Sequence, residues 1–196
     1  MATDEKFVII GAGQAAGRAA EAMRTQGFDG SVTIVGDEAY PPYERPALSK
    51  QVLIGEDEPD STYVHQLAYY DEHQIELKLG VSATAIDRAT KSVSLSDGTT
   101  LDYTKLLIAT GSQLRRLSLP GSDLAGIHYL RGIDDSLAIR AALSADAKIA
   151  VVGGGYIGLE VAAAARKRKC QVTVVEMMDQ LIGRAAAPEI GAIFEA

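Results

Sequence analysis

Residues 148–176 have the amino-acid types and the spacing that bind a dinucleotide. An apolar run is followed by glycines at three fixed positions, Gly153, Gly155 and Gly158, and the stretch ends at an acid, Glu176. This is the G-x-G-x-x-G pattern, with an acid roughly 20 residues further on. Small residues let a pyrophosphate approach the backbone, and a carboxylate accepts hydrogen bonds from ribose hydroxyls. The pattern therefore predicts a dinucleotide site.

Suitable secondary structure is expected on both sides of these glycines. The β-branched runs 149–152 and 172–175 predict two buried parallel strands, and the alanine-rich residues between them predict a helix to about Lys169. The free N–H groups at the start of that helix would face the phosphates. Glu176 would repel a 2′-phosphate and no arginine follows it directly, so we expect NADH rather than NADPH.

The beginning of the chain repeats the motif, although not the sequence. Residues 6–10 predict a strand, a helix is expected to about Gln26, and residues 31–35 predict the next strand. The ribose ligand is expected to be Asp37, or Glu38 if the strand runs one residue longer. Small residues stand at the three positions of a G-x-G-x-x-A turn: Gly11, Gly13 and Ala16.

Two dinucleotide units imply two nucleotides. A glycine unit at the N-terminus commonly takes FAD, and a second unit inside the chain takes the nicotinamide cofactor. The two reactive rings must then meet for hydride transfer. The residues therefore lead to a first hypothesis, which is a flavin-dependent NADH oxidoreductase.

A proline-rich segment, 40–50, carries two candidate chemical residues, Arg45 and Lys50. Pro46 can open a short helix that Gly55 would close, with Lys50 about one turn inside it. From there the lysine ammonium could face a flavin ring and favour its electron-rich reduced form. The alternative is a surface loop with two solvated charges, and the segment taken alone favours that interpretation.

Between the two motifs the sequence predicts a short helix and an antiparallel meander. The helix is expected over 67–73 and is followed by a strand at 75–79. Residues 106–109 predict another buried strand, after which Thr110 and Gly111 would let the backbone approach a cofactor closely. The meander itself is expected to contain three short strands, with an Asp-Gly turn between the last two: 81–87, 91–95 and 101–103.

A linker that contains proline and glycine divides the chain after the meander. We therefore expect the first segment of an FAD-binding domain over residues 1–115 and an incomplete NADH-binding domain over residues 116–196. A helix capped by Asp134 or Asp135 is expected to lead into the second motif and to run through Leu143.

Composition excludes several classes of protein. The formal net charge of -7 argues against nucleic acid as a partner, and no apolar run approaches membrane-spanning length. The single cysteine, Cys170, excludes an internal disulfide and a redox pair of cysteines. The three histidines lack metal-ligand spacing, so we expect no metal. The acidic N-terminus shows no signal-peptide pattern, and a cytoplasmic protein is the default expectation.

With these motifs in place, the sequence resembles the pyridine-nucleotide flavoprotein reductases that serve oxygenases, namely the ferredoxin, putidaredoxin and rubredoxin reductase group. The resemblance covers nearly the whole chain, and its ERPxLSK box is quite specific. One departure is Ala47, where the group commonly has a second proline. The matching residues are GAGQAAG at 11–17, VGDE at 35–38, PPYERPALSK at 41–50, SDGTTLDYTKLLIATGS at 96–112, YLRGIDD at 129–135 and GGGYIGLEVAA at 153–163.

The resemblance implies a fold and an activity. The fold would be α/β, with two Rossmann-like βαβ regions and an antiparallel β-meander, as in an incomplete FAD- and NAD-linked reductase. Hydride would pass from NADH to FAD, and single electrons would then go to a 2Fe–2S ferredoxin or a rubredoxin that feeds an oxygenase. The cysteine that related disulfide reductases carry is absent from residues 40–46, so no thiol relay is implied.

The resemblance also implies roles for individual residues. Lys50 would lie beside the flavin N5 and pair with Glu160, and these two are the candidate catalytic residues. The motifs and the resemblance together give further FAD-binding candidates: Gly11, Gly13, Ala15, Ala16, Asp37, Arg45, Ala83, Thr110, Gly111 and Arg131. The candidates for NADH binding are Gly153, Gly155, Tyr156, Ile157, Gly158 and Glu176.

Four consecutive basic residues, 166–169, end the helix of the second motif. They complement the negative end of the helix dipole, and we favour that interpretation. The alternative is a docking patch for an acidic ferredoxin.

Group members are expected to be about twice as long as this chain, given the usual size of three α/β domains. We therefore expect the chain to be a fragment of a longer protein. Two alternatives to a reductase follow. The chain could bind nucleotides without turnover, or it could be a redox-sensing flavoprotein similar to apoptosis-inducing factors, in which NADH changes an interaction surface.

Overall fold

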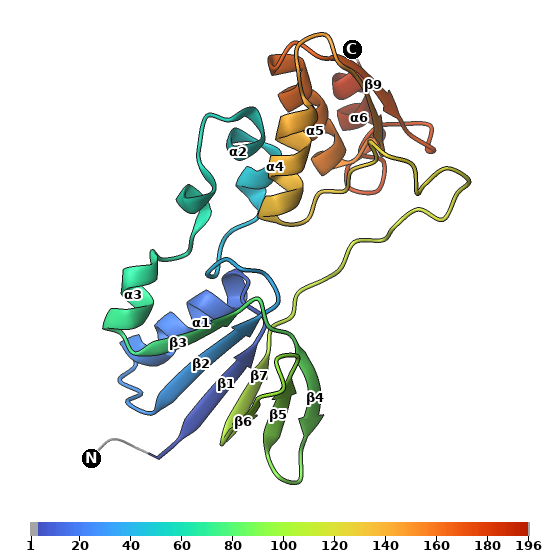
Figure 1. The fold of residues 1–196 in the computed structure, drawn as a ribbon. Helices are drawn as coiled ribbons and strands as arrows, with labels where there is room; N and C mark the ends of the chain where they lie inside the picture. Colours follow the sequence, from blue (N-terminus) through green and yellow to red (C-terminus); the bar gives the residue numbers. More distant parts are fainter. Residues whose placement is uncertain (1–3, 196) are drawn as a thin grey trace. The chain divides into compact units, whose positions relative to one another are not determined.

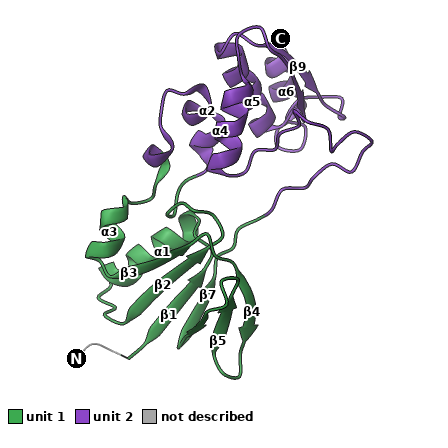
Figure 2. Ribbon diagram, viewed as in Figure 1, with its two compact units in different colours: residues 1–44, 62–112 green, residues 45–61, 113–196 purple. Residues whose placement is uncertain are grey.

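The computed structural model describes residues 4–195, which form two compact units. The first unit contains the residues up to 44 together with 62–112, and the second contains 45–61 and the residues from 113 onward (Figure 2). The last crossing between the units, at 112/113, lies within three residues of the division predicted after residue 115, and segment 45–61 belongs to the second unit. The chain passes between the units at 44/45, at 61/62 and at 112/113.

Four parallel strands form the sheet of the first unit, in the order β3-β2-β1-β7 (Figure 1). Strand β1 lies in the interior of the sheet and its residues Val8, Ile9 and Ile10 are buried. Continuous β-branched runs of this kind are typical of parallel sheets that are covered on both faces. The strand bounds are β1 Lys6–Ile10, β2 Ser31–Gly36, β3 Ile75–Leu79 and β7 Lys105–Ile108.

Two layers cover this sheet and create two cores. Helices α1 (Gln14–Thr25) and α3 (Leu67–Glu72) belong to one layer, and the antiparallel meander of β4 (Ala83–Asp87), β5 (Ser92–Leu95) and β6 (Thr100–Asp102) forms the other. The core with the helices contains Ile9, Ala16, Ala20, Val32, Ile34, Tyr70 and Ile75. The core with the meander contains Val8, Ile10, Val35, Val93 and Leu95.

The second unit is built on a parallel pair of strands, β8 (Lys148–Val152) and β9 (Gln171–Val175), joined by helix α5 (Tyr156–Lys167). Helix α4 (Ile133–Ala142) precedes this βαβ unit and helix α6 (Pro188–Glu195) follows it. Its core contains Leu53, Ile139, Leu143, Ala164, Ala165 and Cys170. In both units the strands expected from the sequence are present, with ends shifted by two residues or fewer.

Segment 45–61 folds into a 3-10 turn, η1 (Pro46–Ser49), and a short helix, α2 (Gln51–Ile54); a second 3-10 turn, η2 (Pro59–Thr62), follows. Leu53 of α2 is fully buried in the core of the second unit. Side chains of the second unit also donate hydrogen bonds to the backbone carbonyl oxygens of the segment. They are Ser136 to Leu48 at 2.7 Å, Arg140 to Val52 at 3.4 Å and Arg168 to Ile54 at 2.8 Å.

Two details of the predicted helices were wrong. Lys50 does not lie inside one helix that begins at Pro46, because the backbone breaks at Lys50 (φ -123°, ψ -110°) between η1 and α2. Neither Asp134 nor Asp135 is the N-cap of α4, since that position is Gly132. Asp135 instead lies in the first turn, where its carboxylate accepts the N–H groups of Arg131 and Gly132. The predicted end of α2 at Gly55 is confirmed, with φ at 90°.

Two of the four consecutive basic residues have structural partners. Arg166 donates to the carbonyl oxygen of Cys170 at 2.8 Å, and Arg168 donates to that of Leu143 at 2.9 Å as well as to Ile54. The bonds from Arg168 thus tie the end of α5 to the end of α4 and to α2, and the one from Arg166 holds the turn that follows α5. Among residues 4–195, no helix has both the length and the apolar character needed to cross a membrane.

Arg24 connects α1 to the strands of the first unit. Its guanidinium donates to four carbonyl oxygens at 2.7–2.8 Å, those of Phe28, Gly30, His73 and Gln74. Gln74 has a φ of 53°, in the left-handed region, directly before β3. The planar fork of an arginine suits several fixed acceptors at once, whereas a lysine would reach fewer of them.

We expect the Arg24→Ala substitution to lower the free energy of unfolding of the first unit by about 2–3 kcal/mol, because partly buried carbonyl groups lose charged donors. Urea titration read by hydrogen–deuterium exchange in β1 and β2 measures the change. Arg18→Ala is the matched control. The exposed Arg18 guanidinium pairs with the half-buried Glu21 and Glu44, and its loss should cost much less than the loss of Arg24 because exposed ion pairs contribute little. Equal losses would contradict the role of Arg24.

Candidate dinucleotide-binding sites

The first glycine of each motif produces the same backbone turn. Gly11 has a φ of 107° and Gly153 a φ of 108°, in a region that side chains rarely adopt. The N–H of Gly11 donates to the carbonyl oxygen of Val35 at 2.8 Å, and the N–H of Gly153 donates to that of Val175 at 2.8 Å. Each turn therefore closes onto the end of the neighbouring strand, which confirms that the two predicted motifs share one geometry.

The second glycine of each motif lies beside open space. Gly13 is the N-cap of α1 and Gly155 the N-cap of α5, both with extended backbone. A Cβ atom added to either one would meet no heavy atom within 4 Å. Space at a helix N-terminus, next to a turn without side chains, suits the pyrophosphate of a dinucleotide. Both sites therefore fit the group that the sequence predicts.

The remaining small residues of the motifs allow close packing. A Cβ on Gly158 would lie 2.0 Å from the carbonyl oxygen of Gly153, so the helix could not sit where it does. Ala16, at the equivalent position in the first unit, is fully buried. Gly11 has a second constraint, because a Cβ there would lie 2.2 Å from the carbonyl oxygen of Ala109 after β7.

Several predicted binding residues lie at the surface of their own unit. Ala15, in the first turn of α1, and Thr110 and Gly111, after β7, are exposed. Tyr156 and Ile157, in the first turn of α5, are 56% and 58% exposed.

The expected ribose ligands of the first unit follow β2. This strand runs to Gly36, one residue further than predicted, which is the condition under which Glu38 was expected instead of Asp37. Asp37 is exposed, whereas Glu38 is half-buried and accepts a hydrogen bond from the Tyr43 hydroxyl. Ala83 lies at the start of β4, where it packs against the core of the meander.

The predicted pair of Lys50 and Glu160 is present within the second unit. The Lys50 ammonium lies 2.8 Å from one carboxylate oxygen of Glu160, and the Ser49 hydroxyl donates to the other at 2.5 Å. Lys50 also donates to the carbonyl oxygen of Pro46 at 3.1 Å. Two consecutive residues therefore hold the two oxygens of one carboxylate. Sequence reasoning missed Ser49, although it directly precedes Lys50 in the ERPxLSK box.

These contacts set the charge of Glu160. Burial would raise the pKa of this carboxyl group, but the hydrogen bonds from Lys50 and Ser49 and the charge of Lys50 outweigh it, so the pKa lies below its usual value. The carboxylate therefore stays ionised at neutral pH and can keep the Lys50 ammonium in place.

Two further predicted FAD-binding residues come together in the second unit. The Arg45 guanidinium donates to the carbonyl oxygen of Arg131 at 2.6 Å. The backbone N–H of Arg131 in turn donates to Asp135 at 2.8 Å, which ties the residues before α4 to its first turn. The sequence placed both arginines in one site but did not predict this contact.

Glu176, directly after β9, is held by backbone groups. One of its carboxylate oxygens accepts the N–H of Gly154 at 2.7 Å, and the other accepts those of Met177 and Met178 at 2.7 and 2.9 Å. The bonds from Met178 and Gly154 are the main reasons that the pKa of this carboxyl group lies below its usual value. No sequence signal predicted these donors. Within the described residues, no cluster of three side chains could hold a metal ion.

These features define a protein with two motifs of the dinucleotide-binding type, one in each compact unit. Residues 5–196 match the pyridine nucleotide-disulphide oxidoreductase family, and the chain belongs to that family. Its fold is the mixed α/β fold of FAD- and NAD-linked oxidoreductases, with a parallel and an antiparallel sheet.

Similar proteins are reductase components of oxygenase systems. The chain is 45% identical over 188 residues to the anthranilate 1,2-dioxygenase system ferredoxin–NAD(+) reductase component of Burkholderia cepacia, covering 96% of this chain and 46% of that protein. It is 42% identical over 188 residues to rhodocoxin reductase of Rhodococcus erythropolis, covering 96% of this chain and 44% of that protein. The chain thus spans about half the length of the curated relatives it matches.

Solved structures lead to the same group. A covalent putidaredoxin reductase–putidaredoxin complex superposes with a TM-score of 0.91 at 37% identity, covering 98% of this chain and 47% of that one. A ferredoxin reductase from Rhodopseudomonas palustris superposes with a TM-score of 0.92 at 34% identity, covering 97% of this chain and 47% of that one.

We expect the Gly155→Ala substitution to separate binding from folding. The added methyl group would enter open space and meet the nucleotide but no protein atom, so NADH affinity should fall by roughly tenfold or more. The free energy of unfolding should change by less than about 0.5 kcal/mol. Calorimetric titration and thermal unfolding measure the two effects. Gly13→Ala, at the equivalent position of the first unit, is the control and should leave NADH affinity unchanged.

Proposed function

We propose that this chain carries the FAD- and NADH-binding part of a reductase that supplies electrons to an oxygenase. Hydride from NADH would reach FAD, and electrons would leave for a 2Fe–2S ferredoxin or a rubredoxin. The observation that carries the proposal is the presence, in one chain, of two glycine turns with the same backbone conformation at the first glycine and open space beside each N-cap. The names of the similar proteins supply the class of electron acceptor.

The first unit would hold FAD. The open space beside Gly13, at the start of α1 next to Ala15 and Ala16, would receive the pyrophosphate. Asp37 or Glu38 would accept the ribose hydroxyls. The remaining candidates of this unit for FAD contacts are Gly11, Ala83, Thr110 and Gly111. Two further candidates, Arg45 and Arg131, belong to the second unit.

The second unit would hold NADH. The turn from Gly153 to Gly158 offers its backbone to the pyrophosphate, with Tyr156 and Ile157 exposed beside it. Glu176 would accept the ribose hydroxyls of the adenosine. When bound, FAD supplies the chemistry that joins a two-electron donor to a one-electron acceptor.

Lys50 and Glu160 would act at the reacting atoms. The Lys50 ammonium places a fixed positive charge where negative charge develops on the reduced flavin ring. Glu160 and Ser49 hold this charge in one position, so no reorganisation is needed during the reaction.

A cytoplasmic location, which the single cysteine favours, belongs to the same proposal.

An anaerobic titration of the purified chain with NADH, after addition of FAD, tests the assignment of both nucleotides. Bound FAD gives a yellow protein, and we expect NADH to bleach its visible absorbance while NADPH bleaches it far less. A chain that takes up no FAD, or whose colour NADH leaves unchanged, would show that these residues alone do not form the proposed site.

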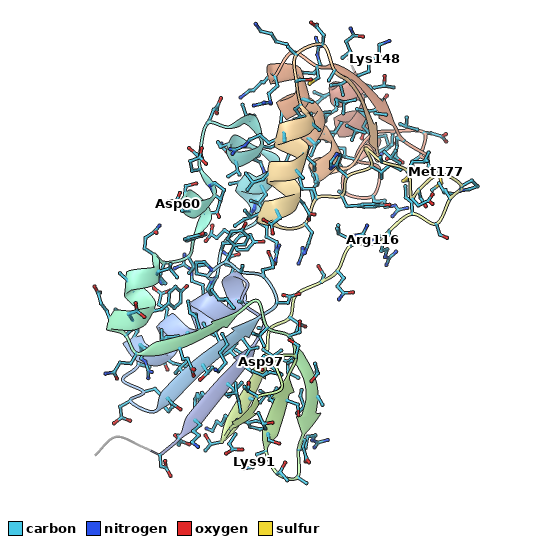
Figure 3. All side chains as sticks on the ribbon, viewed as in Figure 1. Asp60, Lys91, Asp97, Arg116, Lys148 and Met177 are labelled. Carbon is cyan, nitrogen blue, oxygen red and sulfur yellow. The ribbon has the colours of Figure 1, made fainter. Side chains whose placement is uncertain are left out.

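Replacing the Lys50 charge should slow this bleaching without weakening nucleotide binding. We expect Lys50→Met to reduce the rate of flavin reduction by roughly a hundredfold, the usual effect of losing one preorganised charge, while NADH affinity stays within about threefold. Stopped-flow absorbance measures the rate. Lys148→Met, at the labelled exposed residue that begins β8 in Figure 3, is the control. Similar slowing in both variants would rule out a specific role for Lys50.

A further inference from the structure

The hydroxyl group of Ser49 has two acceptors within reach. It lies 2.5 Å from a carboxylate oxygen of Glu160 and 3.3 Å from the carbonyl oxygen of Pro46. A serine hydroxyl has one proton and donates one hydrogen bond at a time. The contact with Glu160 is the shorter one and involves an ionised group, and such bonds are roughly twice as strong as those between neutral groups. The hydroxyl therefore donates to Glu160.

The Lys50 ammonium uses the two acceptors that Ser49 leaves to it. It lies 2.8 Å from the other carboxylate oxygen of Glu160 and 3.1 Å from the carbonyl oxygen of Pro46. If the Ser49 hydroxyl turned to Pro46, one oxygen of Glu160 would lose its donor and Lys50 would share its second acceptor. The direction of the Ser49 hydroxyl thus decides how the whole group is arranged.

Ser49 is also the most buried member of this group. Its residue is 5% exposed, whereas the side chains of Lys50 and Glu160 are 41% and 31% exposed. Water competes for the ammonium and the carboxylate, and an ion pair at this exposure is weak and costs side-chain entropy to hold in one geometry. A buried donor on one carboxylate oxygen limits the rotation of the carboxylate and leaves the other oxygen for the ammonium.

We propose that Ser49 is a positioning residue for the proposed reaction. Its hydroxyl binds one oxygen of Glu160 and thereby restricts the pair of Lys50 and Glu160 to a single arrangement, in which the ammonium also binds Pro46. This inference rests on the proposed function, since it concerns the lysine placed there beside the flavin. Ser49 acts through Glu160 and not on the reacting atoms.

The charge of Glu160 reports on this arrangement. Burial raises the pKa of its carboxyl group, but the hydrogen bonds from Lys50 and Ser49 and the charge of Lys50 lower the pKa by more. Of the elements packed against α5, η1, α2 and β9 contain no titratable side chain. The remaining charged side chains on β8, α4 and α5 are Lys148, Asp134, Asp135, Arg140, Arg166 and Lys167.

Titration of Glu160 in the full chain without nucleotide tests the inference. NMR signals of the side-chain carboxyl carbons follow its protonation, and the signal of Glu160 is the one lost in Glu160→Gln. In Ser49→Ala the ionised carboxylate loses a donor, so we expect the midpoint of its titration to move to higher pH. Ser49→Cys keeps a side chain of similar shape but replaces the hydroxyl with a weak donor, so its midpoint should move in the same direction.

Ser136→Ala is the matched control. Ser136 is buried in the same unit, and its hydroxyl donates to the carbonyl oxygen of Leu48 at 2.7 Å, directly before Ser49. This variant loses a buried hydrogen bond of the same segment but none to Glu160, so the Glu160 midpoint should stay that of the unsubstituted chain. An unchanged midpoint in Ser49→Cys, or an equal shift in Ser136→Ala, would overturn the inference. Circular dichroism identifies the folded variants, and Ser49→Cys decides the outcome if Ser49→Ala unfolds.

The rate of flavin reduction is the second readout. After addition of FAD, Ser49→Ala and Ser49→Cys should be reduced by NADH about tenfold more slowly than the unsubstituted chain, a smaller effect than that of Lys50→Met, with NADH affinity within about threefold. A chain that NADH bleaches at the same rate with and without the Ser49 hydroxyl overturns the inference alone. A chain that takes up no FAD overturns the proposed function, whatever the titration of Glu160 shows.

Discussion

The carboxylate of Glu160 is the contact that positions the candidate catalytic lysine within the second unit. It accepts from Ser49 and pairs with Lys50, although these residues lie more than 100 positions earlier in the chain. The backbone of this segment is held by Leu53 and by hydrogen bonds from Ser136 and Arg168, whereas the Lys50 ammonium is held by Glu160 and the carbonyl oxygen of Pro46. One acidic side chain on α5 thereby fixes the position of the residue proposed to act on the flavin.

The second constraint is the close approach of two backbone segments in each glycine turn, which explains where glycine is required. Gly11 and Gly158 are needed because a methyl group would strike a carbonyl oxygen at 2.2 or 2.0 Å. Gly13 and Gly155 face no protein atom at all, so the protein alone gives no reason for them. The nucleotides proposed above would occupy that space. Two of the four glycines thus serve packing, and the other two are proposed to serve binding.

Local patterns in the sequence were sufficient to predict most of the fold. The alternation of β-branched runs, glycine turns and alanine-rich helices located the strands and the two motifs, because these signals depend on neighbouring residues only. The packing of segment 45–61 with the second unit was missed. It depends on Arg140, Arg168 and Ser136, which bind carbonyl oxygens of distant residues, and such contacts leave no periodic signal.

The sequence predicted which residues belong to the candidate site better than it predicted the contacts between them. Lys50 and Glu160 do form the expected pair, but Ser49 and the backbone donors to Glu176 were not foreseen. Every residue except proline has a backbone N–H group, so the residue types in a sequence do not indicate which of these groups will donate to a given side chain. The predicted N-cap of α4 was wrong as well. The capping position is Gly132, and Asp135, three residues further along, accepts the N–H of Gly132.

The way in which segment 45–61 is inserted determines which of the two units could be produced alone. Glu44 and Thr62, where the chain leaves and re-enters the first unit, are joined by a backbone hydrogen bond of 2.8 Å. To the first unit the segment is therefore an insertion whose two ends already meet, and a short turn could replace it. To the second unit the same segment supplies Leu53 of the core and the Lys50 ammonium. The first unit is thus separable by excision and rejoining, whereas no single cut of the chain releases a complete second unit.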